Sequence, residues 1–253
     1  MKSVRLSGLL YVVLLAWCGC GQRLNHGVAF VLMVNTNAPQ STNSVDLALV
    51  GKVLRKRIDR LGYRSSVERM ADERLRLKLP READREIETV RSTIARRGKL
   101  DFSLVHAESE QYLKDGITPP GYKVLYETRV SPSGEQMKIP HVVSKQPASG
   151  FPTGCIRNAA VTHDSLNNQQ IAFQFDTAGA AAFAKVTSEN IGRALAIIID
   201  DEIYSAPIIR QAITGGSGVV SGGNMKDKEA FKLATLLANP LPAPVQVIEE
   251  STF

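Results

Sequence analysis

Residues 28–34 read VAFVLMV, an uninterrupted apolar run rich in residues that favour β-structure. A run of this length and composition predicts a buried strand. Residues 75–79 read LRLKL, in which three leucines alternate with Arg76 and Lys78. Successive side chains of a strand point to opposite faces, so this second strand has one apolar face and one charged face. The two segments predict a sheet around which the N-terminal half of the chain folds.

An amphipathic helix is predicted between these two strands, capped by Ser44 and ended near Gly62. Its apolar positions recur at steps of three and four residues, at Leu47, Val50, Leu54, Ile58 and Leu61. Residues 63–70 predict a further strand, which a turn at 71–73 joins to the strand at 75–79.

A second amphipathic helix is predicted to end near Gly98, with its apolar positions at Ala83, Ile87, Val90 and Ile94. Residues 100–104 alternate apolar and polar types, which predicts a fourth strand. Two helices between four strands, in the order β-α-β-β-α-β, form the split β-α-β plan of ferredoxin-like folds. We therefore predict the α+β class, with a ferredoxin-like base subdomain over residues 21–106.

Residues 107–253 predict an α+β head subdomain. Its first part, 108–154, is rich in proline and has no long periodic run, so it predicts loops, within which Tyr122–Glu127 and Ile139–Ser144 are compatible with short strands. Its ordered part, 155–250, predicts strands at 170–175, 194–199, 202–206 and 245–248 and helices at 177–190 and 226–238. The last strand is also compatible with a return to the base.

The first twenty residues are predicted to be a lipoprotein-type signal peptide. Lys2 and Arg5 precede an apolar run, and a small residue comes before Cys20, as in bacterial lipoprotein signals whose cysteine is acylated. Attachment at Cys18, an uncleaved short anchor and a plain secretory signal remain as alternatives. Each interpretation predicts an extracytoplasmic chain, which the lipid or the anchor would hold to the periplasmic side of a bacterial membrane.

Composition excludes several classes of protein. The chain has 253 residues, 43% hydrophobic and 22% charged, which is typical of globular domains. Lys and Arg (31) exceed Asp and Glu (25) by 6, too small an excess for a dedicated nucleic-acid binder. Three cysteines and four histidines exclude a disulfide-stapled miniprotein and a Cys-rich zinc protein. The apolar run Leu6–Cys20 is shorter than the roughly 18 residues of a spanning helix, which excludes a polytopic membrane protein.

Residue types that could support catalysis or bind a metal are present but not clustered. His163, Asp164 and Ser165 have the types of a catalytic triad, yet neighbours in sequence do not converge as a triad must. The histidines are scattered, at His26, His106, His141 and His163. Asp200–Glu202 join three carboxylates, which a hairpin turn explains better than a hard-cation site. We predict no catalytic, cofactor-binding or metal-binding residue, and we predict that Cys155 is a small buried hydrophobe.

Two further segments suggest contacts with other molecules. Residues 216–221, GSGVVS, lack the last glycine of a phosphate-binding loop and predict a turn or a strand edge, which could accept a strand of another chain. The first helix carries basic side chains on its predicted polar face, at Lys52, Arg55, Lys56, Arg57 and Arg60. Such a face is usually only solvated, and beside a lipid anchor it would also lie on anionic headgroups.

A longer set of residues keeps a characteristic order and spacing from 182 to 250. The set is Ala182–Ala184, Thr187, Asn190, Gly192-Arg193, Leu195–Ile197, Asp200, Ser205–Ile208, Ile213, Gly215-Gly216, Ser221-Gly222, Glu229-Ala230, Leu233-Ala234, Leu237, Leu241-Pro242, Pro244 and Val247–Glu250. The N-terminal half adds Arg57–Asp59, Leu61-Gly62, Arg76–Pro80 and Gly98–Phe102. Together they resemble the first periplasmic domain of the protein-export subunit SecD, over roughly Ala29 to Glu250.

The resemblance implies a ferredoxin-like base that carries a head subdomain. It also implies a role in the release and forward movement of polypeptides on the outer side of the Sec channel. The implied partners are unfolded exported polypeptides and components of the Sec translocon, with no cofactor. Two positions depart from the family pattern: Asp200-Asp201 replaces an Asp-Gly turn, and Gly223-Asn224 replaces an aromatic residue.

Family members continue into membrane helices, whereas this sequence ends at Phe253. We therefore expect a domain that lacks those helices and cannot couple a proton gradient by itself. The expected function is that of a membrane-tethered domain that assists Sec-dependent export by binding translocating polypeptide or the translocon, without covalent chemistry. The alternative is a stand-alone lipoprotein that uses the fold for another ligand or an envelope partner. A hydrolase is a third hypothesis, for which the sequence shows no convergent nucleophile and base.

Overall fold

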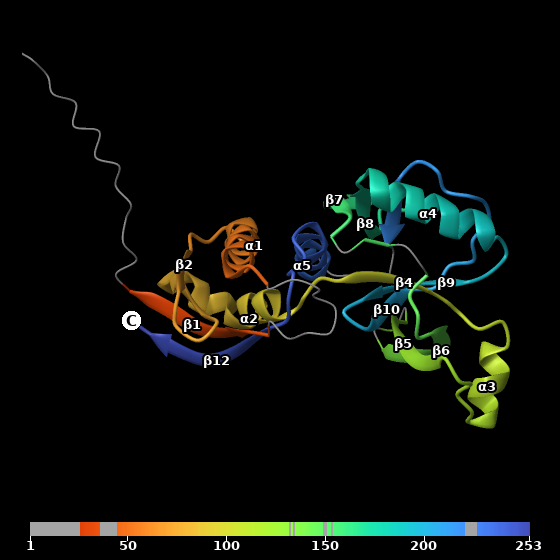
Figure 1. Cartoon of the computed structure of the whole chain (residues 1–253), viewed down its shortest axis with the longest axis horizontal. Helices are drawn as coiled ribbons and strands as arrows, with labels where there is room; N and C mark the ends of the chain where they lie inside the picture. Colours follow the sequence, from red (N-terminus) through yellow and green to blue (C-terminus); the bar gives the residue numbers. More distant parts are fainter. Residues whose placement is uncertain are drawn as a thin grey trace, which may run out of the picture.

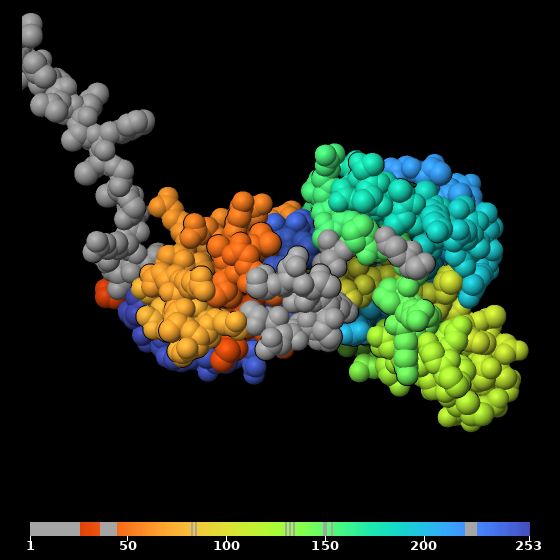
Figure 2. Space-filling model, in the orientation of Figure 1, coloured from red at the N-terminus to blue at the C-terminus, as the bar shows by residue number. Residues whose placement is uncertain are grey.

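The computed structural model describes residues 26–35, 45–131, 133, 135–148, 151–152, 154–220 and 227–253. They form an elongated molecule of two lobes (Figure 1), with α5 (Asp227–Ala238) between the base and the head. Figure 2 shows the same helix at the boundary of the two lobes on the molecular surface. The predicted α+β class is confirmed. Within the described ranges, no helix has the length and apolar character needed to cross a membrane.

The base is built on a four-stranded antiparallel sheet with the order β12-β1-β3-β2. Its strands are β1 (Gly27–Val34), β2 (Ser66–Arg69), β3 (Arg74–Pro80) and β12 (Val245–Thr252). The run at 28–34 forms β1, which is central because β12 and β3 pair along its two edges. Most of β1 is buried, which explains why its sequence is apolar without alternation.

The fourth strand of this sheet differs from the sequence prediction. Residues 100–104 do form a strand, β4 (Leu100–Leu104), but it pairs in the head with β9 (Leu195–Ile199). The place beside β1 is taken by β12, from the end of the described chain. The contiguous β-α-β-β-α-β order over residues 21–106 is therefore wrong in its last strand. Alternation identifies a strand but not its partner, because both sheets offered an edge.

Two helices cover one face of the base sheet. They are α1 (Leu47–Arg60) and α2 (Ile87–Ala95), and a short 3₁₀ helix, η1 (Arg81–Glu86), precedes α2. The apolar stripe of α1 packs on the leucines of β3 and on β1 in one continuous core. The predicted cap Ser44 lies outside the described residues, and the Asp46 carboxylate caps α1 by accepting the Ala48 N–H at 2.8 Å.

The head contains two sheets. The larger has the order β4-β9-β10-β5-β6 and the smaller the order β11-β8-β7. The remaining elements are α3 (Ser109–Asp115), β5 (Tyr122–Val130), β6 (Gln136–Ser144), β7 (Ile156–His163), β8 (Gln169–Phe175), α4 (Thr177–Glu189), β10 (Glu202–Ser205) and β11 (Ser217–Val220). The loop-rich stretch 108–154 thus holds a helix and the long hairpin β5–β6, whose strands include the two short candidates at 122–127 and 139–144.

The two head sheets share a core of aromatic side chains. Phe102 of β4 lies at its centre, 4.7 Å from Phe151 and 5.2 Å from Phe183 between ring centroids. Phe175 of β8 contacts the same rings at 5.2–6.1 Å. Because β4 contributes the central ring, its place in the head is fixed by packing as well as by pairing with β9.

Candidate functional site

The chain passes between the two lobes twice. Residues 96–99 lead from α2 into β4, and residues 239–244 lead from α5 into β12. The two connections lie side by side, since the Leu241 N–H donates to the Arg97 carbonyl at 2.8 Å. This junction is the first candidate site, because any ligand or substitution there acts on both lobes.

A single arginine of the base holds both connections. Arg57 in α1 is fully buried, and its guanidinium donates to four backbone carbonyls. The acceptors are Asn239 at 2.7 Å, Thr93 at 2.7 Å, Arg96 at 2.5 Å and Arg97 at 2.6 Å. The prediction that Arg57 lies on the polar face of α1 is therefore wrong, whereas Lys52, Arg55, Lys56 and Arg60 are exposed.

Helix geometry explains why an arginine fits this position. The carbonyls at the C-terminal end of a helix lack intrahelical donors and carry a partial negative charge. The acceptors Thr93 and Arg96 close α2, and Asn239 follows α5, so Arg57 satisfies the ends of two helices at once. Burial lowers the pKa of the Arg57 guanidinium to about 9, and the charge of nearby Asp200 opposes this shift.

Asp200 ties the head to the first connection. Its carboxylate accepts the N–H groups of Gly98 and Lys99, each at 3.0 Å, and lies 3.2 Å from Nε of Arg96. Asp200 belongs to the two-residue loop between β9 and β10, in which its φ is 51° and that of Asp201 is 65°. Positive φ at both loop residues is the pattern of a type I′ hairpin turn, which suits glycine best.

The ion pairs of residues 200–202 distinguish a hairpin turn from a cation site. The carboxylates of residues 200–202 are directed to basic groups: Asp201 pairs with Lys123 at 2.9 Å, and Glu202 lies 3.8 Å from Arg96. Within the described ranges, no group of three or more His, Cys, Asp or Glu side chains is arranged to hold a metal ion. The turn interpretation therefore accounts for this segment.

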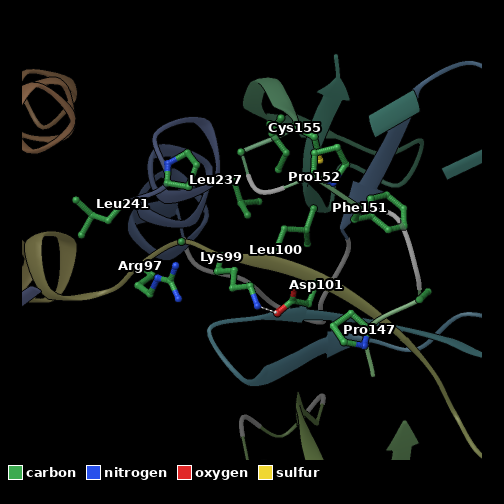
Figure 3. Close-up of a pocket in the computed structure, with 15 residues that line it drawn as sticks. Arg97, Lys99, Leu100, Asp101, Pro147, Phe151, Pro152, Cys155, Leu237 and Leu241 are labelled. Carbon is green, nitrogen blue, oxygen red and sulfur yellow. Dashed lines mark ion pairs between the residues drawn. The ribbon is translucent and has the colours of Figure 1, made fainter. Parts of the chain in front are cut away.

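A cavity of about 430 Å³ opens beside the junction, here named the junction cavity. Leu100, Leu237 and Leu241 line it from the two connections and their flanking elements, and Phe151 and Cys155 line it from the head (Figure 3). On its wall Lys99 pairs with Asp101 at 2.8 Å, drawn as a dashed line in Figure 3.

Cys155 is a buried free thiol, which agrees with the predicted role of a small buried hydrophobe. Burial raises the pKa of the Cys155 thiol to about 11, and the charge of Asp176 adds to the shift. The thiol is therefore protonated and weakly nucleophilic near neutral pH. Cys18 and Cys20, the predicted sites of lipid attachment, lie outside the described residues.

The head carries a larger cavity of about 690 Å³, here named the head groove. Phe173, Phe183 and Ile197 form its floor, and Ile208 and Val219 lie on its rim with exposed fractions of 63% and 49%. Large apolar side chains at such exposure beside an apolar floor mark a surface suited to an apolar ligand.

One end of the head groove is charged. Glu127 of β5 is buried, and its carboxylate accepts two hydrogen bonds from Arg129, at 2.7 and 3.1 Å. His141 of β6 lies 3.1 Å from the same carboxylate through Nε2. The hydrogen bond to Glu127 raises the pKa of Arg129. The sequence interpretation gave Glu127 no role in a site, because it was only the last residue of a short candidate strand in a loop-rich stretch.

The edge of the smaller sheet borders the head groove. The glycine-rich segment forms β11 there, as the outermost strand of the order β11-β8-β7, and Gly218 and Val219 line the groove. A Cβ on Gly218 would lie 2.6 Å from Cζ of Phe173, so glycine is required for the ring to pack against this strand. The predicted strand edge is therefore present at residues 217–220, and residues 221–226 lie outside the description.

The triad-like residues form a turn. Asp164 accepts the N–H groups of Leu166 and Asn168 at 2.9 and 2.8 Å and the side-chain amide of Asn168 at 3.0 Å. These hydrogen bonds lower the pKa of Asp164, with the side chain of Asn168 as the largest cause. Asp164 thus shapes the connection between β7 and β8, next to His163 and Ser165.

The remaining histidines are apart from each other. His106 lies between the rings of Tyr112 and Tyr122, with centroid distances of 4.8 and 4.7 Å, and accepts the Glu108 N–H through Nδ1. His141 contacts the Glu127 carboxylate, and His26 is exposed ahead of β1.

Comparison with known proteins gives a consistent family. Residues 123–243 match the sequence profile of the SecDF P1 head subdomain. The chain is 32% identical over 214 residues to a SecD protein translocase subunit of Magnetococcus marinus, covering 83% of this chain and 39% of that protein. It is 34% identical over 210 residues to the corresponding subunit of Calditerrivibrio nitroreducens, covering 80% and 40%. The chain thus spans about two fifths of the length of these relatives.

Solved structures share the two-lobed fold. A structure of SecDF, described as a membrane component that enhances protein export, superposes with a TM-score of 0.65 at 26% identity and covers 87% of this chain and 98% of that one. SecDF in a super-membrane-facing form gives a TM-score of 0.67 at 24% identity over 89% of this chain and 30% of that one.

The fold and the profile define a domain of a protein translocase subunit, with a base and a head. The chain belongs to the SecD/SecDF family and carries its first periplasmic domain, P1. The predicted family resemblance is therefore confirmed.

The Arg57 contacts predict a large loss of stability on substitution. Arg57→Met removes a buried cation and leaves four carbonyls without their donor, so we expect the free energy of unfolding to fall by about 3–5 kcal/mol in denaturant titrations. Arg57→Lys keeps the charge but not the fork of donors, so its free energy of unfolding should lie between those of the unchanged chain and Arg57→Met. Arg60→Met, on the exposed side of α1, loses only one 3.3 Å hydrogen bond to the Ala159 carbonyl and should lower the value by less than about 1 kcal/mol. Equal effects of the 57 and 60 substitutions would contradict this account.

The β9–β10 turn predicts opposite outcomes at adjacent residues. Asp201→Gly relieves a left-handed conformation, and it loses only the exposed pair with Lys123, so we expect a gain of about 0.5 kcal/mol in the free energy of unfolding. Asp200→Gly gains the same relief but removes three hydrogen bonds at the junction, so we expect a net loss of about 1–3 kcal/mol. Denaturant titrations of both variants check the pair. A gain in both would contradict the junction contacts of Asp200, and a loss in both would contradict strain in the turn.

Proposed function

We propose that the chain acts outside the cytoplasm in Sec-dependent protein export, where the head groove binds extended, unfolded segments of the polypeptide being exported. The observation that carries the proposal is the apolar groove beside the outer edge of β11. Membership of the SecD/SecDF family supports the link to export, since its relatives are protein translocase subunits.

The groove and the edge have complementary roles in this proposal. An edge strand presents backbone N–H and C=O groups to which any extended peptide can pair, whatever its sequence. Alternate side chains of that peptide would point toward the floor formed by Phe173, Phe183 and Ile197. This combination favours apolar, unfolded segments and tolerates many sequences, as an export client requires.

Binding and release alone account for such a role. Two of the polar residues that line the groove, Glu127 and Arg129, are paired with each other, and we propose that they limit the apolar surface rather than react with a substrate. The chain is thus proposed to act without covalent chemistry and without a cofactor.

Peptide titrations test the groove. A labelled peptide of alternating apolar residues should bind in fluorescence anisotropy. Ile208→Asp or Val219→Asp should weaken its affinity about ten- to hundredfold, because each places a charge where an apolar side chain of the bound peptide would be buried. Leu166→Asp is the matched control, since Leu166 is 80% exposed in the β7–β8 turn. Its affinity should equal that of the unchanged chain.

A second peptide separates strand pairing from simple apolar contact. Methyl groups on alternate backbone nitrogens block pairing along one edge but leave the side chains intact. The methylated peptide should bind at least tenfold more weakly. Equal affinity of both peptides would refute β11 pairing, and equal affinity of the 208, 219 and 166 variants would refute the groove as the binding site. Capture of a translocon component alone, with no peptide affinity, would favour the channel as the partner.

Membrane tethering through Cys20 forms a separate part of the proposal. A lipid on Cys20 would hold the base close to the outer face of the membrane, and removal of that thiol should release the chain. Cys20→Ser should move the protein from the membrane to the soluble fraction and abolish labelling with radioactive palmitate. Cys18→Ser, the neighbouring control, should change neither. Continued membrane association of the Cys20→Ser variant would instead indicate an uncleaved anchor.

A further inference from the structure

We propose that the junction cavity binds a small amphiphilic anion: a carboxylate carried on a short apolar body. The cavity of about 430 Å³ falls within the size range of small-molecule sites, about 300–1,000 Å³. It is distinct from the head groove, and the proposal does not depend on peptide binding there.

Its walls are largely apolar. Leu100 and Leu237 face it near the connections, and Phe151 and Ile156 face it from the head, with several prolines between them. These side chains offer no hydrogen bonds, so they favour a hydrocarbon or aromatic group over a sugar or nucleotide. The apolar body of the ligand would therefore lie against them.

The charged side chains that line the cavity do not cancel. Arg97, Lys99 and Asp101 line it, and Lys99 is already paired with Asp101. These three side chains leave one net positive charge, at Arg97. The Nε atom of Arg97 is buried, and among the described residues it has no hydrogen-bond partner. A buried donor without an acceptor is costly. Because this atom is enclosed by protein, a bound acceptor would remove that cost once a small rotation of the Arg97 side chain turns the donor toward the cavity.

This charge selects the class of anion. A guanidinium pairs with a carboxylate through two parallel hydrogen bonds, and a single carboxylate charge balances the single cation. A phosphate dianion would leave an uncompensated charge beside apolar walls. A fatty carboxylate and the C-terminal carboxylate of an apolar peptide share the required chemistry, so the test includes both.

The location of the junction cavity predicts that a bound ligand stabilises the chain. Arg97 lies in the connection from base to head, where its carbonyl also accepts hydrogen bonds from Arg57 and Leu241, and Leu237 and Leu241 flank the return connection. An occupant of the cavity touches both connections (Figure 3). Its binding should therefore raise the melting temperature of the whole chain.

The experiment uses the full chain with four probes: octanoate, octanol, and an acetylated Leu-Phe dipeptide with a free or an amidated C-terminus. Two readouts are combined, the melting temperature and the rate of Cys155 alkylation followed by mass spectrometry of its peptide. Cys155 lines the cavity, so an occupant there shields it directly, and the Arg97 variants separate this shielding from stabilisation by a ligand in the head groove. Octanoate or the free dipeptide should slow alkylation and raise the melting temperature, whereas octanol and the amide should do neither at the same concentration. The more protective of the two acids identifies the source.

Substitution of Arg97 completes the test. Arg97→Gln should weaken binding of the protective acid about ten- to hundredfold, Arg97→Lys should retain part of the affinity, and the surface control Arg55→Gln should bind as the unchanged chain does. Circular dichroism of the unliganded variants checks that each is folded. Protection by octanol as strong as by octanoate, the same affinity in Arg97→Gln, or no protection by either acid would each overturn the proposal.

Discussion

The arrangement of the two lobes depends on the burial of one guanidinium. Arg57 is fully removed from solvent, and it donates to four carbonyls that lie at or just past the ends of two helices. The favourable geometry offsets the cost of desolvating the cation, because every acceptor lies at the negative end of a helix or just past it. Since the acceptors belong to both connections between base and head, the same contacts that stabilise the base also fix where the head begins.

The head adds its own contact to this centre through Asp200. That carboxylate binds the backbone of the first connection from a tight turn whose residues are held in the left-handed region. Gly98 of the connection also has a positive φ of 70°, and a Cβ there would lie 2.4 Å from the Leu236 carbonyl oxygen. The connection thus combines a residue that must be glycine with polar contacts from both lobes. The two cavities lie in different places, one beside the connections and one in the head.

Local patterns predicted the helices and strands of the base well, but they did not predict which elements pair with or contact each other. The apolar run at 28–34 and the alternation at 75–79 correctly predicted two strands, because burial on one or both faces leaves a direct mark on the sequence. The strand at 100–104 was found, but its partner was not, since alternation is the same beside β1 and beside β9. The charge of Arg57 led to its assignment to the polar face, although it follows Leu54 by three residues and precedes Leu61 by four, which places it beside the apolar stripe.

The candidate sites show the same division. The glycine-rich edge at 217–220 was predicted, because glycine marks close approach of another group, here the ring of Phe173. The head groove and its pair Glu127 and Arg129 were not, since the hairpin that carries them has no simple period in a proline-rich stretch.

By itself the sequence determined the α+β class, most of the helices and strands, and the family, because these follow from periodicity and from the order of many residues along the chain. Only the tertiary structure decided that the last strand closes the base sheet, that Arg57 joins the two connections, and that apolar side chains from distant segments form two cavities. These features depend on contacts between residues far apart in the chain, and such contacts arise from the packing of the whole molecule rather than from any local pattern.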